Sequence, residues 1–263
     1  MSMVQLEGCC LNGLPSRVEI RRADRFSLYL HRDSRPPVEI IYDLSNIKVI
    51  NHMVAVGGQH RLHVVEHLFS ALYGLNLFDL RIDAYGDEIP FFDGSSSDFV
   101  FAVNGLKNHG YRAVRLGREI SVRRGDSHIH YTPLETDDLV VEMSLTHRYI
   151  GNQRIVLEIN PDSYEKEIAP ARTFVFTDDD DPRLQQLPPY GIGITGSKMY
   201  AAAPLRFPDE PVRHKLLDLL GDMYVLKKKI YGKISGNNTS HELNLHFAHK
   251  LVSAMRGSDD KQP

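Results

Sequence analysis

The order of the expected elements repeats along this chain, and that repeat constrains the fold more than any other feature. The first series has three short strand-like runs, a helix pattern, an alternating run and a second helix, at residues 18–20, 26–30, 38–41, 62–75, 79–85 and 97–106. The second series begins with four strand-like runs, at residues 119–124, 128–133, 139–145 and 154–159. A short helix at 163–168 and a further strand-like run at 173–176 follow. The series ends with a long helix at 212–226, a strand at 228–235 and a last helix at 242–255. Strands followed by helices, twice, favour an α+β fold with two similar halves.

The two series meet at residues 108–117. We therefore expect a first half at residues 1–110, a second half at residues 117–256 and a disordered tail at residues 257–263. The chain has 263 residues, a length that suits one large domain or two smaller ones.

The composition is that of a soluble globular protein, with 42% hydrophobic and 25% charged residues. A net charge of −3 gives no sign of bulk nucleic-acid binding. No apolar run approaches the ~18 residues of a membrane span, and the first ten residues lack the layout of a signal peptide. Cys9 and Cys10 are adjacent, so neither a disulfide framework nor a cysteine zinc site is expected. These features favour a cytoplasmic protein without a transmembrane segment.

The long helix at residues 212–226 carries an unusual polar stripe. His214, Asp218 and Asp222 follow one another at intervals of four residues, which places them on one edge of the helix. An imidazole and a carboxylate one turn apart can hold one metal ion, and a catalytic zinc usually has three protein ligands. His67, on the otherwise apolar helix at residues 62–75, is the best candidate for a third ligand, and Glu66 stands beside it.

Each part of this pattern also has a simpler interpretation. A histidine on an apolar helix, such as His67, is more often a satisfied core residue. The pair of His214 and Asp218 is also typical of a polar helix edge or of a helical HD-type phosphohydrolase. His63 lies four residues before His67, and we expect it to be exposed or capped rather than a partner of the metal site.

Five blocks of sequence, in the same order along nearly the whole chain, resemble the LpxC family of zinc-dependent UDP-3-O-acyl-N-acetylglucosamine deacetylases of lipid A biosynthesis. The blocks are VEHLFSALYGL, DEIPFFDGSSSDFV, ARTFVF, VRHKLLDLLGD and SHELN. The resemblance implies two β-α-α-β halves that form a sandwich with the helices between the sheets. This agrees with the α+β fold of two similar halves expected from the element order.

The resemblance also implies a role for each matching residue. It makes His67, His214 and Asp218 the zinc ligands, and Glu66 the general base that takes a proton from the metal-bound water. His241 is then the residue that stabilises the oxyanion and protonates the leaving amine. The remaining implied site residues are Asp222, which supports that histidine, Thr173, which helps to hold the tetrahedral intermediate, and the substrate-binding residues Lys215, Phe174 and His147.

The sequence departs from the family pattern in three places. Asn12 replaces a histidine in the loop GCCLNG, and Asn238 stands where a lysine is usual, with Ser240 in place of a glycine. The stretch at residues 187–211 is shorter than the family's β-α-β insert, and after a helix-like segment GSKMYAAA its last strand is cut back. We expect the passage for a long acyl chain to be shortened or open.

The leading hypothesis is a zinc amidohydrolase that removes the N-acetyl group of a sugar nucleotide, by default UDP-3-O-acyl-N-acetylglucosamine, with possible contact to an acylated substrate. A second hypothesis is an LpxC-like paralogue that acts on another N-acetylated amino sugar or nucleoside. The alternatives from other classes are an HD-type phosphohydrolase and a non-catalytic binding protein that kept the fold.

Overall fold

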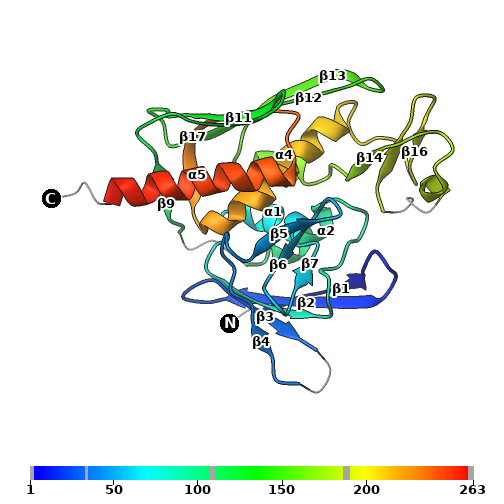
Figure 1. The fold of residues 1–263 in the computed structure, drawn as a ribbon. Helices are drawn as coiled ribbons and strands as arrows, with labels where there is room; N and C mark the ends of the chain where they lie inside the picture. The colour runs from blue at the N-terminus through cyan, green and yellow to red at the C-terminus, as the bar shows by residue number, and fades with distance from the viewer. Residues whose placement is uncertain (1–2, 33–34, 107–109, 186–189, 260–263) are drawn as a thin grey trace.

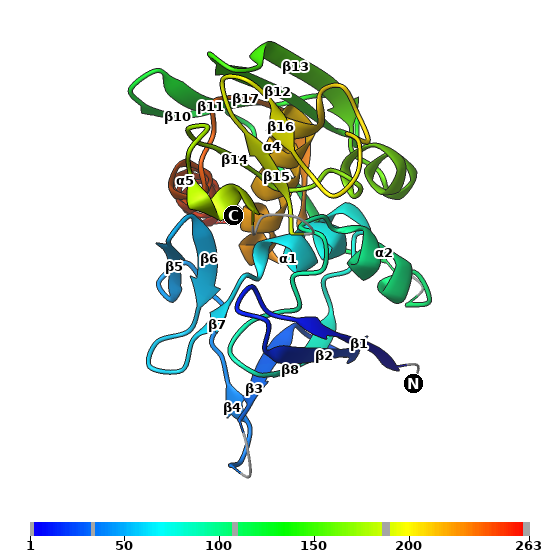
Figure 2. The same cartoon turned by 90° about the vertical axis from the view of Figure 1, so that its right-hand side faces the viewer.

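The computed structural model describes residues 3–32, 35–106, 110–185 and 190–259 (Figure 1). Two main sheets lie on opposite sides of the molecule, and four helices lie between them (Figures 1 and 2). The helices are α1 (Glu66–Gly74), α2 (Ser97–Val103), α4 (Glu210–Met223) and α5 (His241–Asp259). The expected α+β sandwich with helices between the sheets is therefore confirmed.

The first sheet has the strand order β1-β2-β8-β3-β4. Its strands are β1 (Met3–Cys9), β2 (Pro15–Arg22), β3 (Ser27–His31), β4 (Val38–Glu39) and β8 (Leu80–Tyr85). Alternation along β2 and β3 sends every second side chain into the core, for example Val18 and Ile20 on β2, which are fully buried. The buried side chains of this first sheet pack on one side of the helix layer.

The second sheet has the order β10-β11-β17-β12-β13, and β9 pairs with the beginning of β17. Its strands are β9 (Ala113–Arg115), β10 (Ile120–Arg124), β11 (Ser127–Thr132), β12 (Leu139–His147), β13 (Gly151–Glu158) and β17 (Lys229–Asn237). The central strand, β17, is the last strand along the chain and runs parallel to β12. It leads directly to α5 and so fixes where that helix begins.

The close crossing of α1 and α4 joins the two halves of the core. A Cβ atom added at Gly221 would lie 2.3 Å from the carbonyl oxygen of Glu66, so only glycine allows the two backbones to approach this closely. Ser70 of α1 donates a hydrogen bond to the carbonyl oxygen of Leu217 on α4, at 2.8 Å. These contacts set the position of one helix relative to the other.

Two small sheets flank the helices. One consists of β5 (Ile47–Ile50), β6 (Met53–Val56) and β7 (Leu62–His63), and the other of β14 (Phe174–Phe176), β15 (Ile192–Ile194) and β16 (Met199–Tyr200). The shorter segments are α3 (Pro161–Ser163), the π-helix Tyr164–Ile168 and the 3-10 turns Pro182–Gln185 and Tyr224–Leu226.

The structure corrects three expectations from the sequence. The helix expected at residues 62–75 begins only at Glu66, because Val64 has a φ of 60°, which no right-handed helix accommodates. The helix-like segment GSKMYAAA contains the strand β16, which pairs with β15. The tail expected at residues 257–263 starts inside α5, which continues to Asp259; the last four residues lie outside the described part.

None of the described helices has both the length and the apolar character that a membrane span requires.

Candidate active site

A cavity of about 780 Å³ opens where α1, α4 and the first residues of α5 meet β14 and β15. Eight of the ten residues that the sequence assigns to the site line this cavity. The two exceptions are Asp222, which lies behind His241, and His147, which packs on a lining residue. The fold thus gathers into one place residues from positions 66 to 241 of the chain.

Three lining residues of the cavity, His67, His214 and Asp218, form a compact group of metal-ligand type. One potential ligand atom from each lies within 4.8 Å of the others, and all three side chains are buried. His67 comes from the first turn of α1, whereas the other two lie one turn apart on α4. The separation between the single ligand and the pair therefore depends on the crossing of α1 and α4.

The donor atoms of this group suit a divalent cation such as zinc. Nδ1 of His214 donates to the carbonyl oxygen of Ala171 at 3.0 Å, so Nε2, which lies 3.2 Å from Oδ1 of Asp218, is the ring nitrogen that can ligate a metal ion. Nδ1 of His67 is buried and has no hydrogen-bond partner among the described residues. Two imidazole nitrogens and one carboxylate are ligands that zinc accepts in catalytic sites.

The protonation states favour the same interpretation. Burial, reinforced by the neighbouring charge of His214, lowers the pKa of His67 to about 3, so its ring is neutral and can ligate. Burial alone would raise the pKa of Asp218, but the nearby His214, Lys215 and His241 hold it well below its usual value. The carboxylate is therefore ionised and available as a ligand.

Glu66 projects into the cavity beside this group. Its side chain is 3% exposed, and Oε2 accepts a hydrogen bond from the backbone N–H of Val54 on β6, at 3.2 Å. Burial raises the pKa of Glu66 to about 7, against a smaller opposing effect from His241. A carboxylate with this proton affinity can both accept and release a proton near neutral pH.

His241 begins α5 and faces the same cavity. Its Nδ1 donates to Oδ2 of Asp222, at 2.8 Å, and Nδ2 of Asn244 donates to the same oxygen, also at 2.8 Å. Burial by itself would lower the pKa of His241, but the charges of Asp222, Asp218 and Glu66 outweigh it and raise the pKa to about 10. The imidazole is therefore held as a cation whose Nε2 can donate a proton.

Two of the three expected substrate-binding residues, Lys215 and Phe174, line the cavity, and His147 does not. Nζ of Lys215 lies 3.1 Å from Oδ2 of Asp218 and 5.5 Å from the centre of the Phe174 ring. Thr173 lies at the wall, and its backbone N–H donates to the carbonyl oxygen of Gly94 at 2.7 Å. His147 does not line the cavity; its ring stacks on Phe176, with centroids 3.6 Å apart, and supports that lining residue from behind.

The two asparagines that depart from the family pattern have local structural roles. Asn238 has a φ of 48°, which asparagine tolerates well, and its side chain accepts a hydrogen bond from the backbone N–H of Thr146 at 2.8 Å. Asn12 accepts from the backbone N–H of Leu14 in the turn between β1 and β2. Neither side chain lines the cavity, whereas Ser240 and Leu11 do.

Sequence reasoning missed two supports of the site. Asn244 is fully buried and holds Asp222, although it lies within the block SHELN that drew attention to His241. The buried pair of Arg172 and Glu210, at 2.9 Å, joins the segment before β14 to the first turn of α4. Asn244 could have been found from its spacing, one turn after the histidine; nothing in the sequence alone pairs Arg172 with Glu210.

The family model for LpxC, described as UDP-3-O-acyl N-acetylglycosamine deacetylase, matches residues 2–253. The matched range includes both main sheets, the starts of all four large helices and every residue of the cavity. The chain is therefore a member of the LpxC family, and the resemblance inferred from the five sequence blocks is confirmed.

Proposed function

We propose that this deacetylase hydrolyses the N-acetyl group of a UDP-linked amino sugar and uses zinc held by His67, His214 and Asp218. The observation that carries the proposal is that Glu66 and His241, whose pKa values are both raised, line the same cavity as those three side chains. Amide hydrolysis requires a base for the attacking water and an acid for the departing nitrogen, and these two residues provide both.

A zinc ion bound here would supply Lewis acidity that polarises the amide carbonyl and acidifies water. Glu66 accepts the proton of the attacking water, since burial gives its carboxylate an unusually high affinity for it. His241 donates a proton through Nε2 to the leaving nitrogen, and Asp222 orients the ring by accepting from Nδ1. Thr173, which lines the cavity, would hydrogen-bond the substrate near the scissile bond.

Lys215 and the aromatic residues Phe174 and Phe176 supply the binding surface for the substrate. Lys215 lines the cavity, and its ammonium group would meet the diphosphate, while the two phenylalanine rings, with centroids 5.2 Å apart, offer an apolar wall. A nucleotide sugar presents both kinds of group, so the lining fits this class of substrate. His147 acts through Phe176, which it stacks against, rather than by direct contact.

We further infer that the substrate does not need a long O-acyl chain. Residues 190–209 contain the strands β15 and β16 but no helix, so the described part of the insert lacks the helical element expected of the family. A chain buried along its length would gain ~0.8 kcal/mol per CH₂, and a shortened passage forfeits most of that gain. Long-chain and unacylated substrates should then differ in kcat/KM by no more than about tenfold, or ~1.4 kcal/mol.

The deciding experiment is acetate release from UDP-N-acetylglucosamine and from its 3-O-myristoyl form, with and without a chelator. Chelator-sensitive release from either substrate supports the proposed activity, and the ratio of the two kcat/KM values tests the chain-length inference. A preference of about a thousandfold or more for the myristoyl form would mean that the long passage is intact. Release from neither substrate would favour the second hypothesis, an LpxC-like enzyme for another N-acetylated amino sugar or nucleoside.

The two alternatives from other classes, an HD-type phosphohydrolase and a non-catalytic binding protein, are tested by different observations. A helical HD-type phosphohydrolase is incompatible with the two main sheets. A non-catalytic binding protein would bind the sugar nucleotide without releasing acetate. The intact set of Glu66, His241 and the three metal-type residues in one cavity argues against it.

A further inference from the structure

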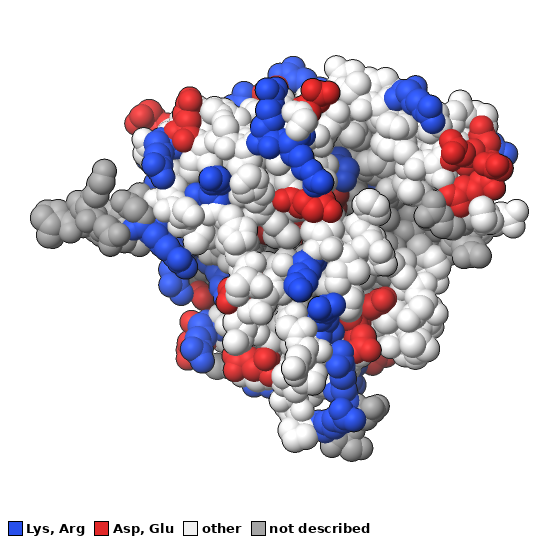
Figure 3. Space-filling view, viewed as in Figure 1, with Lys and Arg blue, Asp and Glu red and all other residues white. Residues whose placement is uncertain are grey.

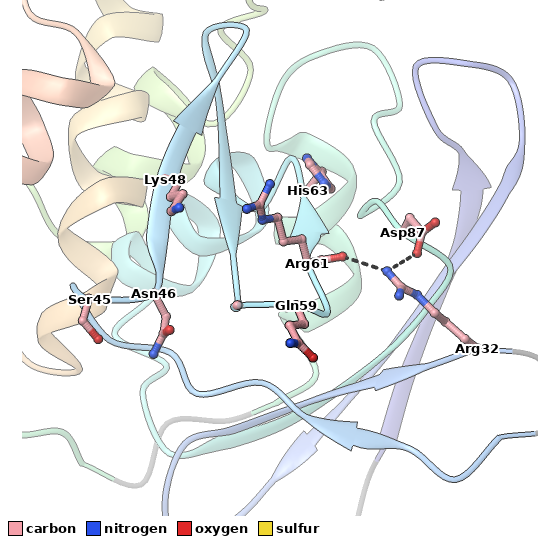
Figure 4. Close-up of a pocket in the computed structure, with 10 residues that line it drawn as sticks. Arg32, Ser45, Asn46, Lys48, Gln59, Arg61, His63 and Asp87 are labelled. Atoms are coloured by element: carbon pink, nitrogen blue, oxygen red, sulfur yellow. Dashed lines mark hydrogen bonds and ion pairs between the residues drawn. The ribbon is translucent and has the colours of Figure 1, made fainter.

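A second cavity, of about 590 Å³, lies on the first half of the molecule and shares no lining residue with the active-site cavity. It is formed by the small sheet β5–β7, the loop at residues 57–61 and the end of β3. Figure 4 shows its charged side chains, Arg32, Lys48, Arg61 and Asp87, together with His63. A cavity of this size is typical of small-molecule sites, for which ~300–1,000 Å³ is usual.

The charge of this lining is strongly one-sided. Arg32, Lys48 and Arg61 are cationic and Asp87 is the one acidic residue of the lining, so the walls carry two net positive charges. The whole chain, by contrast, has a net charge of −3. Figure 3 shows a run of Lys and Arg side chains over the region of β5–β7 that extends toward the end of the β3–β4 hairpin. Positive potential is therefore concentrated at this cavity.

Arg32 fixes the geometry of the cavity. One of its terminal nitrogens lies 2.5 Å from Asp87 and donates to the carbonyl oxygen of Arg61 at 3.2 Å, as Figure 4 shows. Asp87 is thereby already paired, and its backbone oxygen accepts from the backbone N–H of His63. The acidic residue of the lining neutralises Arg32 and leaves the other cations uncompensated.

Arg61 and Lys48 are these uncompensated cations. Within the described residues, neither side chain has a hydrogen bond or an ion pair, and Nε of Arg61 is buried without a partner, as is Nε of Arg32. In Figure 4 the guanidinium group of Arg61 extends across the small sheet toward β5, the strand that carries Lys48. Lys48 is exposed and Arg61 is half-buried, so the charged ends of these side chains have no counter-charge within the described residues, and an anionic ligand would supply one.

The geometry points to a binding site for a phosphate-bearing anion in this second cavity. The guanidinium of Arg61 offers parallel N–H donors that match two oxygens of a phosphate, and Lys48 adds a point charge from the neighbouring strand. Arg32 adds positive charge and holds the loop through its hydrogen bond to Arg61, while His63 and Gln59 border the same space. The phosphate can belong to a free solute or to the headgroup of a lipid, because both present the same oxygens.

This site is structurally connected to the active site but independent of it. The turn between β5 and β6, with Asn51 and His52, borders the active-site cavity, whereas the opposite end of the same sheet borders the second one. The binding of phosphate there requires neither the metal-type group nor any substrate, so the inference stands or falls separately from the proposed deacetylase activity.

The test is a titration of the full-length protein with inorganic phosphate, followed by the amide NMR signals of Gly57 and Gly58, which line the cavity. We expect saturable shifts of these signals, and an affinity at least about tenfold lower in the double variant Arg61→Gln/Lys48→Gln. The control is Arg118→Gln/Lys250→Gln, which removes the same charge from exposed positions elsewhere and should bind like the unaltered protein.

A second arm distinguishes the source of the phosphate. It measures co-sedimentation with phosphatidylcholine vesicles that contain or lack phosphatidylglycerol, for the same three proteins. Binding of the anionic vesicles that is lost only in Arg61→Gln/Lys48→Gln would assign the site to a lipid headgroup, even where free phosphate binds weakly. If neither probe binds, or if the control variant loses as much binding as the cavity variant, the inference is wrong.

Discussion

Nδ1 of His241 lies 2.8 Å from Oδ2 of Asp222, although the two residues belong to different helices, α5 and α4. Asp222 follows Asp218 by one turn of α4, so a single helix edge both presents a metal-type carboxylate and holds the imidazole opposite. The hydrogen bond from His241 to Asp222 thus ties the beginning of α5 to the same edge of α4 that carries His214 and Asp218.

Replacement of this aspartate should shift the basic side of the pH–rate profile. In Asp222→Asn the neutral amide still accepts from Nδ1 but no longer stabilises the imidazolium, so the pKa of His241 falls. Activity requires the protonated ring and is lost as pH rises through that pKa, so the basic limb should move to lower pH. The profile of kcat/KM against pH measures this, and an unmoved basic limb would contradict the role of the pair.

The two limbs of the unaltered enzyme also have expected positions. Glu66 must be ionised and His241 protonated, and without a metal their pKa values are raised to about 7 and about 10. A divalent cation beside both groups lowers both values. We therefore expect an acid limb below pH 7 and a basic limb below pH 10, and Glu66→Gln should abolish the acid limb alone.

Metal content should separate ligands from acid–base groups. His67→Ala, His214→Ala and Asp218→Ala should each lose bound zinc, because two remaining ligands hold the ion poorly. Glu66→Gln and His241→Gln should retain zinc while turnover falls by ~10²–10⁴-fold. Elemental analysis and acetate release on the same preparations check both statements. The exposed His246 provides a matched control, since His246→Ala should change neither.

The crossing of α1 and α4 predicts a steric effect at a distance from the chemistry. In Gly221→Ala the added methyl group meets the carbonyl oxygen of Glu66 at 2.3 Å, so the helices must separate. We expect a loss of ~1–3 kcal/mol in the free energy of unfolding and weaker zinc retention. Gly105→Ala is the control, because nothing lies within 4 Å of its added Cβ. Thermal unfolding of both variants measures the difference. If Gly105→Ala lost as much stability as Gly221→Ala, the close crossing of α1 and α4 would not be the cause.

The buried Lys229 gives a prediction for stability against pH. Nζ donates to Oδ1 of Asn76 and to the carbonyl oxygen of Ile159, yet burial lowers the pKa of Lys229 to about 8. The unfolded chain has a pKa of ~10.4 and binds more protons between these values, so the contribution of Lys229 to stability rises as pH increases from 8 to 10.4. The rise should be on the order of 2–3 kcal/mol in total.

Denaturant unfolding of the unaltered protein and of Lys229→Met at several pH values measures this effect. The difference between their free energies of unfolding should grow across that window, because other titrating groups cancel in the difference. Lys250→Met, at an exposed position, should leave the pH dependence as it is. A difference that stays constant from pH 8 to 10.4 would show that Lys229 does not titrate there.

Local periodicity predicted the parts of the site that depend on one helix. His214 and Asp218 could be placed together because residues four apart in a helix are always neighbours. His67 could not be joined to them by spacing, since their proximity arises from the packing of α1 on α4. It was a candidate only because a histidine on an apolar helix stands out, and the family resemblance then strengthened that assignment. The role of Asn244 was not predicted, because it depends on a buried hydrogen bond to Asp222 that only the packed structure shows.

The fold was predictable to a similar degree. Alternating runs located most strands of the two main sheets, because one face of each strand packs on helices. The small sheet β5–β7 was not anticipated, since its strands have two to four residues, too few for a pattern. The positive φ of Val64, where β-branched residues are strained, has no signature in the sequence. The cluster of Arg61 and Lys48 likewise exists only after this sheet has formed.

The place of β17 at the centre of the second sheet has a consequence for biosynthesis. Its neighbours β11 and β12 are translated about a hundred residues earlier, and they stay separated until residues 229–237 leave the ribosome. A nascent chain that stalls before that point has two unjoined sheet edges and lacks His241 altogether. Such incomplete chains expose strand edges that quality-control proteases can recognise, and they lack the residue to which we assign the role of acid.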